Sequence, residues 1–526
     1  MPKDRQKSWR TKEPVNSELK SLLAKALSIP PVLAGILIQR GISTFDEARA
    51  YFRPSISNLH DPFLMKDMDK AVDRIERAIL QKENILIYGD YDVDGTTAVA
   101  LVYDFLSQIH PQISFYIPDR YAEGYGISFK GIDFAADNGF SLIIALDCGI
   151  KANDKVDYAN QKGIDFIICD HHNPGDEIPD AIVLDPKRKD CDYPYKELSG
   201  CGIGFKLIQA IAKKRGLPED AVYSYLDLVT ISTAADIVPI TGENRILAYH
   251  GLNEINTSPR PGIAAMLETA GKKLPLDITD LVFVIGPRIN AAGRIHSGQN
   301  AVELLIAKTK KEALEKSQLL DDHNDQRKNL DKDMTRMALE MIEADATLLN
   351  SKTTVLYSEN WHKGVIGIVA SRVMETWYRP TIILTGSNGK IAGSARSVRD
   401  FDLYEAIESC SDLLEQFGGH KYAAGLTMKK ENLQKFIEKF ERVVSDSITD
   451  ELLTPRIEID AEIDLSELFL PGENPHEIPK FFRILKQMGP FGPGNMNPVF
   501  RVNHVNDAGF SRIVAEEHLK LHVAGN

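Results

Sequence analysis

The sequence predicts an α/β protein in which two α/β domains are joined by a long helix and followed by a small β-rich domain. Three observations carry this prediction. Four apolar runs each end on an aspartate, a stretch of about 40 residues has no glycine or proline, and a late region has short alternating segments between Gly/Pro turns. At 526 residues the chain is too long for one hydrophobic core, so several domains are expected.

Residues 1–55 are predicted to form a small helical segment, because leucines recur at helical spacing on both sides of Pro30. Residues 56–306 are predicted to form an α/β domain in which strands alternate with helical patterns. Its strands are expected at the four apolar runs, Asn84–Asp90, Leu142–Asp147, Phe166–Asp170 and Ala181–Asp185. Continuously apolar strands of this kind are typical of a buried parallel sheet.

Residues 307–350 are predicted to form the connecting helix, because leucine, methionine and alanine alternate with charges of both signs. Two helices with a bend near Asp321–Asn324 are the alternative. Residues 351–450 form the second predicted α/β domain, with strands at Thr353–Tyr357 and Thr381–Thr385. Residues 451–526 are predicted to form an OB-like β-barrel that binds nucleic acid, and the end of the sequence directly after a strand leaves its completeness open.

The composition, with 43% hydrophobic and 26% charged residues, is that of an ordinary globular protein. The polar start and the lack of any apolar run approaching about 18 residues lead us to expect a soluble protein that is not exported. Five cysteines without CxxC spacing favour the reducing cytoplasm. The formal net charge of −13 neither supports nor excludes a polyanionic substrate.

The aspartates that end the strands predict a metal site, because the carboxyl ends of parallel strands meet at one edge of the sheet. The first of them opens the motif Asp90-Tyr91-Asp92-Val93-Asp94-Gly95, which leads into a helical pattern. A calcium-binding loop is the alternative interpretation. It requires a glutamate at the twelfth position, and counting from Asp90 that position holds Leu101.

The third run ends on Asp170-His171-His172, and adjacent imidazoles beside a carboxylate suit Mn, Fe or Zn. Asp147, taken alone, is equally well explained as a helix N-cap. Asp236 ends an apolar helical stretch, where an acid opposes the helix dipole, so a functional role is favoured over a capping one. So many ligands predict two ions bridged by an aspartate, with Mn²⁺ or Mg²⁺ preferred over zinc because carboxylates dominate.

These motifs, followed by Gly418-Gly419-His420, resemble those of the DHH/DHHA1 phosphoesterase superfamily. Within it, the segments Gly200–Gly204, Gly286–Arg294, Trp361–Gly367 and Phe491–Asn495 are similar to those of the single-strand-specific 5′→3′ DNA exonucleases. Smaller superfamily members carry a histidine four residues before the first aspartate of the motif. This chain has Leu86 there, which matches the exonuclease branch.

The resemblance implies that Asp90, Asp92, Asp147, His171 and Asp236 bind two Mn²⁺ or Mg²⁺ ions. The same resemblance implies that His172 contacts the scissile phosphate or supports a ligand, and that Asp170 orients the histidines. It leaves open whether Asp94 is a ligand.

Substrate contacts are expected mainly from the second α/β domain. Glycines there allow a phosphate to approach the main chain beside Ser394, Arg396, Gly419 and His420. The alternative is that Gly418-Gly419 makes a turn that His420 caps. In the first domain, Arg294 is a candidate for binding the 5′ phosphate, Arg288 is a weaker one, and Asn290 lies in the same segment.

Single strands also need aromatic side chains for base stacking. The candidates are Tyr121, Tyr125, Trp361 and Tyr422, although an aromatic residue of this kind is more often part of a core.

The resemblance thus implies a two-metal phosphodiesterase that degrades single-stranded DNA from 5′ to 3′ into 5′-mononucleotides during recombination and repair. It also implies a RecQ-type helicase and a single-strand-binding protein as partners. One alternative is a phosphoesterase for short oligonucleotides, cyclic dinucleotides or pyrophosphate, although such relatives lack a β-rich tail. Another is a non-catalytic scaffold, which would be expected to have lost metal ligands, and here all of them are present.

Overall fold

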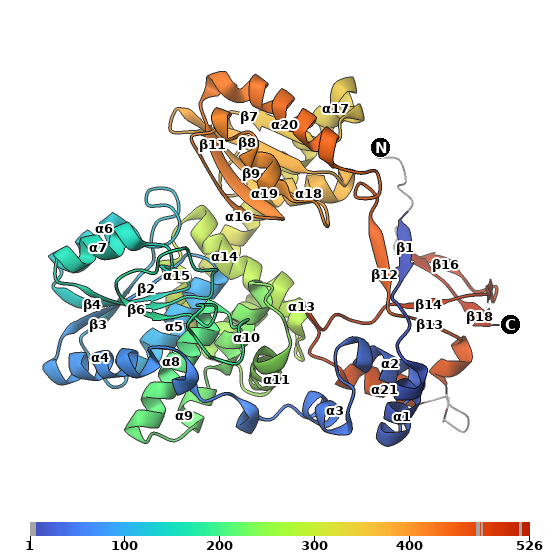
Figure 1. Cartoon of the computed structure of the whole chain (residues 1–526), viewed down its shortest axis with the longest axis horizontal. Coiled ribbons are helices and arrows are strands. Elements are labelled where there is room, and N and C mark those ends of the chain that lie inside the picture. The colour runs from blue at the N-terminus through green and yellow to red at the C-terminus, as the bar shows by residue number, and fades with distance from the viewer. Residues whose placement is uncertain (1–6, 470–473, 475–476, 515–517, 526) are drawn as a thin grey trace. The chain divides into compact units, whose positions relative to one another are not determined.

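The computed structural model describes residues 7–469, 474, 477–514 and 518–525, and the chain divides into two compact units (Figure 1). The first unit contains Lys12–His323 and Ile459–Asn526, and the second contains Asn324–Glu458 with the first eleven residues.

The first unit is built on a five-stranded parallel sheet with the strand order β3-β2-β4-β5-β6. The strands are β2 (Asn84–Gly89), β3 (Ile113–Tyr116), β4 (Phe140–Leu146), β5 (Asp165–Cys169) and β6 (Ile182–Leu184). Four of them are the runs that end on an aspartate, so the predicted parallel sheet is confirmed.

Helices cover both faces of this sheet. Successive side chains of a strand point to opposite faces, and those of β2 belong to two different core clusters. Ile85 and Ile87 of β2 belong to a core cluster with α5 (Val93–Ser107) and α8 (Gly200–Arg215). Leu86 and Tyr88 belong to a cluster on the other face. The other helices of this part of the chain are α4 (Met68–Gln81), α6 (Phe129–Asp137), α7 (Asn153–Gln161), α9 (Asp220–Tyr223), α10 (Leu226–Ala235), α11 (Gly242–Thr257), α12 (Pro261–Thr269), α13 (Ile278–Asp280), α14 (Gly286–Ile295) and α15 (Gln299–Leu305).

The predicted connecting helix is α16 (Lys310–Ala344), which is continuous, so the alternative of two helices is wrong. Its first part contributes Ala313 and Leu320 to the core of the first unit. Its last part contributes Met334, Ala338 and Ile342 to a cluster of the second unit.

The second unit contains a mixed five-stranded sheet with the order β10-β11-β9-β8-β7, in which only β7 and β8 run parallel. The strands are β7 (Thr354–Ser358), β8 (Thr381–Ser387), β9 (Lys390–Arg396), β10 (Gln416–His420) and β11 (Ala423–Met428). The helices are α17 (Ala346–Asn350), α18 (Ile366–Trp377), α19 (Leu403–Glu408) and α20 (Leu433–Ser447).

The N-terminal helices α1 (Ser17–Leu27), α2 (Pro31–Gln39) and α3 (Phe45–Phe52) share a core cluster with α21 (Lys480–Gln487) and two tail strands. Those strands, β13 (Ala461–Ile463) and β14 (Phe500–Val502), pair in parallel. The other strand pairs are β1 (Ser8–Thr11) with β12 (Arg456–Ile459), β15 (Val505–Asp507) with β18 (Val523–Gly525), and β16 (Arg512–Val514) with β17 (His518–Lys520). The described tail residues form these small sheets rather than a closed barrel.

Among the described helices, none is by itself both long and apolar enough to cross a membrane, and only the bent pair of α1 and α2 passes that test by length and composition.

Candidate metal centre

The first acidic motif lies where β2 ends and α5 begins. Asp90 follows the strand and is fully buried, and Asp92 caps α5 by accepting a hydrogen bond from the Gly95 amide at 3.0 Å. Position 95 requires glycine, because a Cβ there would lie 2.4 Å from the Asp90 carbonyl oxygen. The chain after Gly95 continues as helix, which argues against the calcium-loop alternative.

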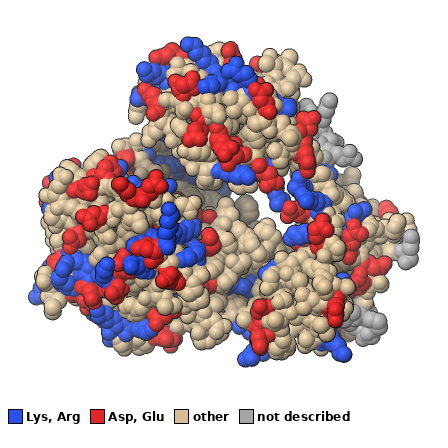
Figure 2. All heavy atoms as spheres, in the orientation of Figure 1, with Lys and Arg blue, Asp and Glu red and all other residues tan. Residues whose placement is uncertain are grey.

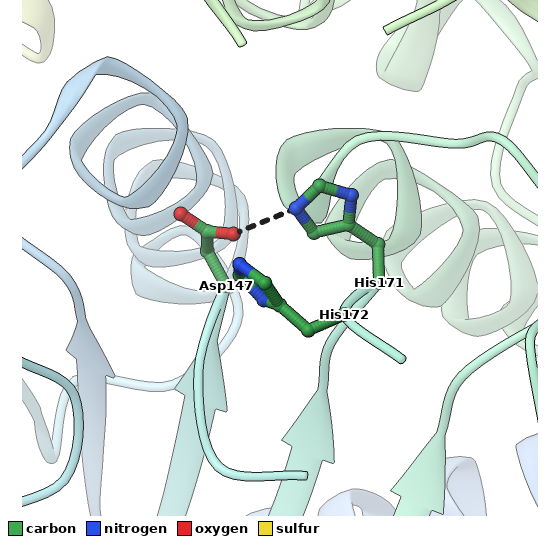
Figure 3. Close-up of side chains that lie close together, drawn as sticks. All are labelled: Asp147, His171 and His172. Carbon is green, nitrogen blue, oxygen red and sulfur yellow. Dashed lines mark ion pairs between the residues drawn. The ribbon is translucent and has the colours of Figure 1, made fainter. Parts of the chain in front are cut away.

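Asp147 and the histidine pair follow β4 and β5, which neighbour each other in the sheet (Figure 3). The His171 ring points toward Asp147, and its Nε2 atom lies 3.2 Å from Asp147 Oδ1. Asp147 has φ of +60°, a conformation that is uncommon outside glycine and concentrates at functional sites. It does not cap α7, whose N-cap residue is Ala152, so the capping alternative is wrong.

His171 Nε2 is the point on which three carboxylates converge. It also lies 3.5 Å from Asp236 Oδ2 and 3.7 Å from Asp94 Oδ2. Among the described residues, both ring nitrogens of His171, Asp147 Oδ1 and Asp90 Oδ2 are buried without a hydrogen-bond partner. Buried polar atoms are nearly always satisfied, and mixed carboxylate and imidazole donors are typical of divalent metal ligands. The residues present therefore fit a metal ion.

The pKa values of these buried residues also favour a bound cation. Burial, reinforced by the neighbouring carboxylates, raises the pKa of Asp90 and of Asp147 well above the usual range and raises that of Asp236 to about 8. Burial lowers the pKa of His171, which keeps its imidazole neutral. Acids this close cannot all ionise without a compensating cation. A divalent ion would supply that compensation.

Asp94 is held by hydrogen bonds rather than left free. Its carboxylate accepts from the Gly200 and Cys201 amides at the start of α8 and from Ser232 Oγ, each at 2.7 Å. Gly200 also packs against the metal site, because a Cβ there would lie 2.6 Å from Asp147 Cβ. Sequence reasoning missed Ser232, because a buried serine within an apolar helix gives no signal by itself.

Asp170 and His172 form a hydrogen-bonded pair beside this cluster. Asp170, fully buried, accepts from the Ile150 amide at 2.9 Å, from the His171 amide at 2.8 Å and from His172 Nδ1 at 2.7 Å. Burial opposes ionisation of Asp170, but its hydrogen bonds lower its pKa overall. Burial also acts against a charge on His172, yet Asp170 raises the pKa of that imidazole to about 8. The other ring nitrogen of His172 lies 3.2 Å from the Tyr125 hydroxyl.

The three candidate substrate-binding residues on α14 differ from one another in burial and in their contacts. Arg288 is buried, donates to the Val284 carbonyl and pairs with Asp321 at 2.8 Å. Arg294 and Asn290 are partly exposed on the same helix. Gly293 brings α14 against the first motif, since a Cβ there would lie 2.6 Å from the Tyr91 carbonyl oxygen.

Arg120 is a further cation beside the first motif that sequence reasoning did not identify. Its guanidinium lies 4.8 Å from the centre of the Tyr91 ring. Arg120 stands in a loop without periodicity, between β3 and α6, so the sequence pattern gave no reason to single it out. Its positive charge acts on Asp90, where it partly offsets the rise in pKa.

The polar candidates of the second unit lie on its sheet. Register places Arg396, Ala423 and His420 in one row across β9, β11 and β10, and Ser394 lies two residues before Arg396, so the polar side chains share a face. Arg396 donates to Ser394 Oγ at 3.0 Å. A Cβ on Gly367, in the first turn of α18, would lie 3.0 Å from both side chains.

The end of strand β10 depends on glycine. Gly419 has φ of +146°, and a Cβ there would lie 2.3 Å from the Ala423 carbonyl oxygen. Gly418 and Gly419 lie within β10, and the turn is made by Lys421 and Tyr422, so the alternative in which the two glycines make a turn is wrong. His420 is exposed and accepts a hydrogen bond from the Tyr422 amide at 3.4 Å. This contact leaves the imidazole accessible at the surface.

The four aromatic candidates for base stacking divide by exposure. Trp361 is 5% exposed and belongs to a core cluster, so the stacking prediction for it is wrong. Tyr121, Tyr125 and Tyr422 are exposed. On the face drawn in Figure 2, acidic and basic side chains are interspersed, in keeping with a formal net charge of −13.

Comparison with known protein families identifies the superfamily of this chain. Three family models match successive parts of the chain, namely the DHH family N-terminal domain at residues 84–233, the DHHA1 domain at 350–446 and the RecJ OB domain at 459–526. The domains are thus those of a DHH/DHHA1 protein, and the predicted superfamily is confirmed.

Similar sequences and solved structures identify the family within this superfamily. The chain is 37% identical to the single-stranded-DNA-specific exonuclease RecJ of Bacillus subtilis, over 93% of this chain and 61% of that protein. It is 32% identical to RecJ of Salmonella typhimurium, over 94% of this chain and 87% of that protein. The crystal structure of Thermus thermophilus RecJ in complex with Mn²⁺ superimposes with a TM-score of 0.83 at 28% identity, covering 98% of this chain and 72% of that one. The chain belongs to the RecJ family.

Proposed function

We propose that this protein is a metal-dependent exonuclease that degrades single-stranded DNA from its 5′ end to 5′-mononucleotides, in DNA recombination and repair. The observation that carries the proposal is the buried, unpartnered donor set around His171 Nε2, in a chain whose relatives are named single-stranded-DNA-specific exonucleases. A non-catalytic scaffold has no need to keep such a set.

Asp90, Asp92, Asp147, His171 and Asp236 would hold two divalent ions, Mn²⁺ or Mg²⁺, the metals present in the Thermus thermophilus structures. When bound, two such ions lower the pKa of a water molecule and stabilise the leaving oxygen of a phosphodiester. Asp94 has both oxygens engaged by amides and a hydroxyl, so we assign it a positioning role rather than that of a ligand.

His172 is assigned the role of a hydrogen-bond donor to the substrate phosphate. Asp170 fixes its Nδ1 atom and, in the metal-free protein, raises the pKa of the imidazole to about 8, which favours the protonated ring at neutral pH. A protonated imidazole can donate a hydrogen bond to a non-bridging phosphate oxygen. Asp170 acts through this contact and not on the substrate.

Phosphate contacts are proposed for each unit separately, with the 5′ phosphate assigned to Arg294 of the first unit. Arg294 and Arg120 lie on segments that contact Tyr91 of the first motif. In the second unit, Ser394 and Arg396 lie against the first turn of α18, where amide groups favour an anion. Arg288 is the weakest of the proposed contacts, because Asp321 already neutralises it.

The remaining predictions belong to the same proposal. We propose a cytoplasmic location, a RecQ-type helicase and a single-strand-binding protein as partners, and domain boundaries near residues 55, 306, 350 and 450.

The test is digestion of long oligonucleotides labelled at either the 5′ or the 3′ end, with Mn²⁺. The 5′ label should appear first as a mononucleotide, while the 3′ label stays on a shortening strand. Release that begins at the 3′ label would refute the direction. Faster cleavage of dinucleotides than of long strands would favour the short-oligonucleotide alternative.

A further inference from the structure

The motif Phe491–Asn495 lies in the segment Gly489–Asn495, which is not part of the metal centre. We infer that it positions the metal ligand Asp236. This inference rests on the proposed two-metal site and adds a positioning role for a segment more than 250 residues further along the chain.

Asp236 is followed by a strained turn. Ile237 has φ of +61°, and its side chain is 68% exposed. A β-branched residue in the left-handed region is a true outlier, and such strain persists only where the surrounding structure holds it. The direction in which Asp236 leaves the end of α10 therefore depends on what holds the residues after Ile237.

The Gly489–Asn495 segment provides that support. The Ile240 amide donates to the Pro493 carbonyl at 2.7 Å. Gly492 and Gly494 lie so close to the turn that a Cβ on Gly492 would be 2.5 Å from Ile240 Cγ1, and one on Gly494 would be 2.8 Å from Thr241 Cγ2. This explains why both positions are glycine.

The segment is itself fixed by Asn495, which is 2% exposed. Its side-chain amide donates to the Met488 carbonyl at 3.0 Å and to the Pro490 carbonyl at 2.7 Å. Its Oδ1 atom accepts from the Tyr51 hydroxyl at 2.8 Å and from Arg40 at 2.5 Å. All four polar contacts of this buried amide are therefore made.

Arg245 of α11 ties the segment to the catalytic part of the unit. It donates to the Gly489 carbonyl at 2.8 Å and to the Tyr51 carbonyl at 3.0 Å, and it stacks on the Tyr51 ring at 3.8 Å. A tail segment, the N-terminal helices and the residues after Asp236 thus form one rigid support.

The experiment is Gly492→Ala, whose added methyl group must displace Ile240. We expect the affinity for Mn²⁺, measured calorimetrically without DNA, to fall roughly tenfold, the lower range for residues that orient a ligand. The stabilisation of the protein by Mn²⁺ in thermal melts should fall in parallel. Gly35→Ala is the matched control. Gly35 is a buried glycine of α2, and a Cβ there would make only ordinary contacts, the nearest at 3.4 Å from Lys20 Cδ.

A double variant makes the test specific. Ile240→Ala removes the atom that the new methyl group meets, so Gly492→Ala with Ile240→Ala should bind Mn²⁺ more tightly than Gly492→Ala alone. Unchanged Mn²⁺ affinity in Gly492→Ala, or no recovery in the double variant, would overturn the inference. Because Mn²⁺ binding is measured without DNA, failure of the exonuclease proposal would show separately, as a parent protein that binds Mn²⁺ but does not cleave.

Discussion

The two α/β units present polar groups on their sheets in opposite ways. In the first unit, the carboxylates and His171 at the ends of parallel strands are mostly buried, and their pKa values are displaced from the usual range. In the second unit, Ser394, Arg396 and His420 lie on a mixed sheet among glycines, where they are partly or fully exposed.

The two arrangements suit different ligands. Buried, mutually repelling acids favour a small, highly charged cation, because the low dielectric strengthens both the repulsion and its relief. Exposed donors beside glycines suit a larger anion that keeps part of its hydration, such as a phosphate. The first unit should therefore respond to metal and pH, and the second to the phosphate groups of the substrate.

The largest expected effect is that of Asp147→Asn. We expect kcat to fall more than about 1000-fold, because a metal ligand is lost. In EDTA the variant should melt no earlier than the parent, since one repelling carboxylate has been removed. Nuclease assays and thermal melts would measure both effects. Asp185→Asn is the matched control, a buried aspartate at the end of β6 that bonds the Lys187 amide.

Arg396→Ala should act on the substrate and not on the metal. We expect the KM for single strands to rise roughly tenfold, the scale of a lost hydrogen bond to a charged group, whether their 5′ end carries a phosphate or a hydroxyl. Steady-state kinetics on the two substrates would measure it. Arg399→Ala removes an exposed arginine that pairs with Glu458, and it should leave both KM values near those of the parent. An unchanged KM on both substrates would contradict a phosphate contact.

Ser232→Ala removes one of the three donors that hold Asp94. Mn²⁺ affinity should fall by about tenfold, because Asp94 would be less firmly oriented beside His171. Thr233→Ala is the control on the same helix, since its buried hydroxyl bonds the Val229 carbonyl. The role assigned to Asp94 fails if calorimetry gives the two variants the same Mn²⁺ affinity.

The smallest effect is a pH dependence of the metal-free protein. The folded pKa of Asp236, about 8, lies above that of the unfolded chain, so stability is lost as pH rises toward 8. His172, also near 8, loses its stabilising proton over the same range. Between pH 6.5 and 8 in EDTA we expect Tm to fall by roughly 4 °C, and saturating Mn²⁺ should remove most of the fall. A flat EDTA profile would contradict the buried acidic cluster.

Much of the first unit could be predicted from the sequence, because its signals are local. Continuously apolar runs identify β2, β4, β5 and β6, and the aspartate after each run marks the sheet edge. The apolar runs alone did not show which of these aspartates face the metal centre. Asp185 matched no motif and makes a turn with Lys187, whereas Asp147 faces His171.

What could not be predicted depends on contacts between distant segments. Ser232 and Gly200 matter because α8 and α10 meet at Asp94, and Gly492 matters because its loop packs on Ile240. Trp361 was a stacking candidate because aromatic residues serve both cores and bases, and only packing decides between them. In the second unit, residue types alone suggested donors, and register was needed to place them on one face.

A crystal structure of this protein soaked with Mn²⁺, with anomalous scattering used to locate the metal, would test the proposed two-metal site. Two peaks should lie at the carboxyl end of β2, β4 and β5, bound by Asp90, Asp92, Asp147, His171 and Asp236. No peak among these side chains at saturating Mn²⁺, or peaks only elsewhere, would contradict the account.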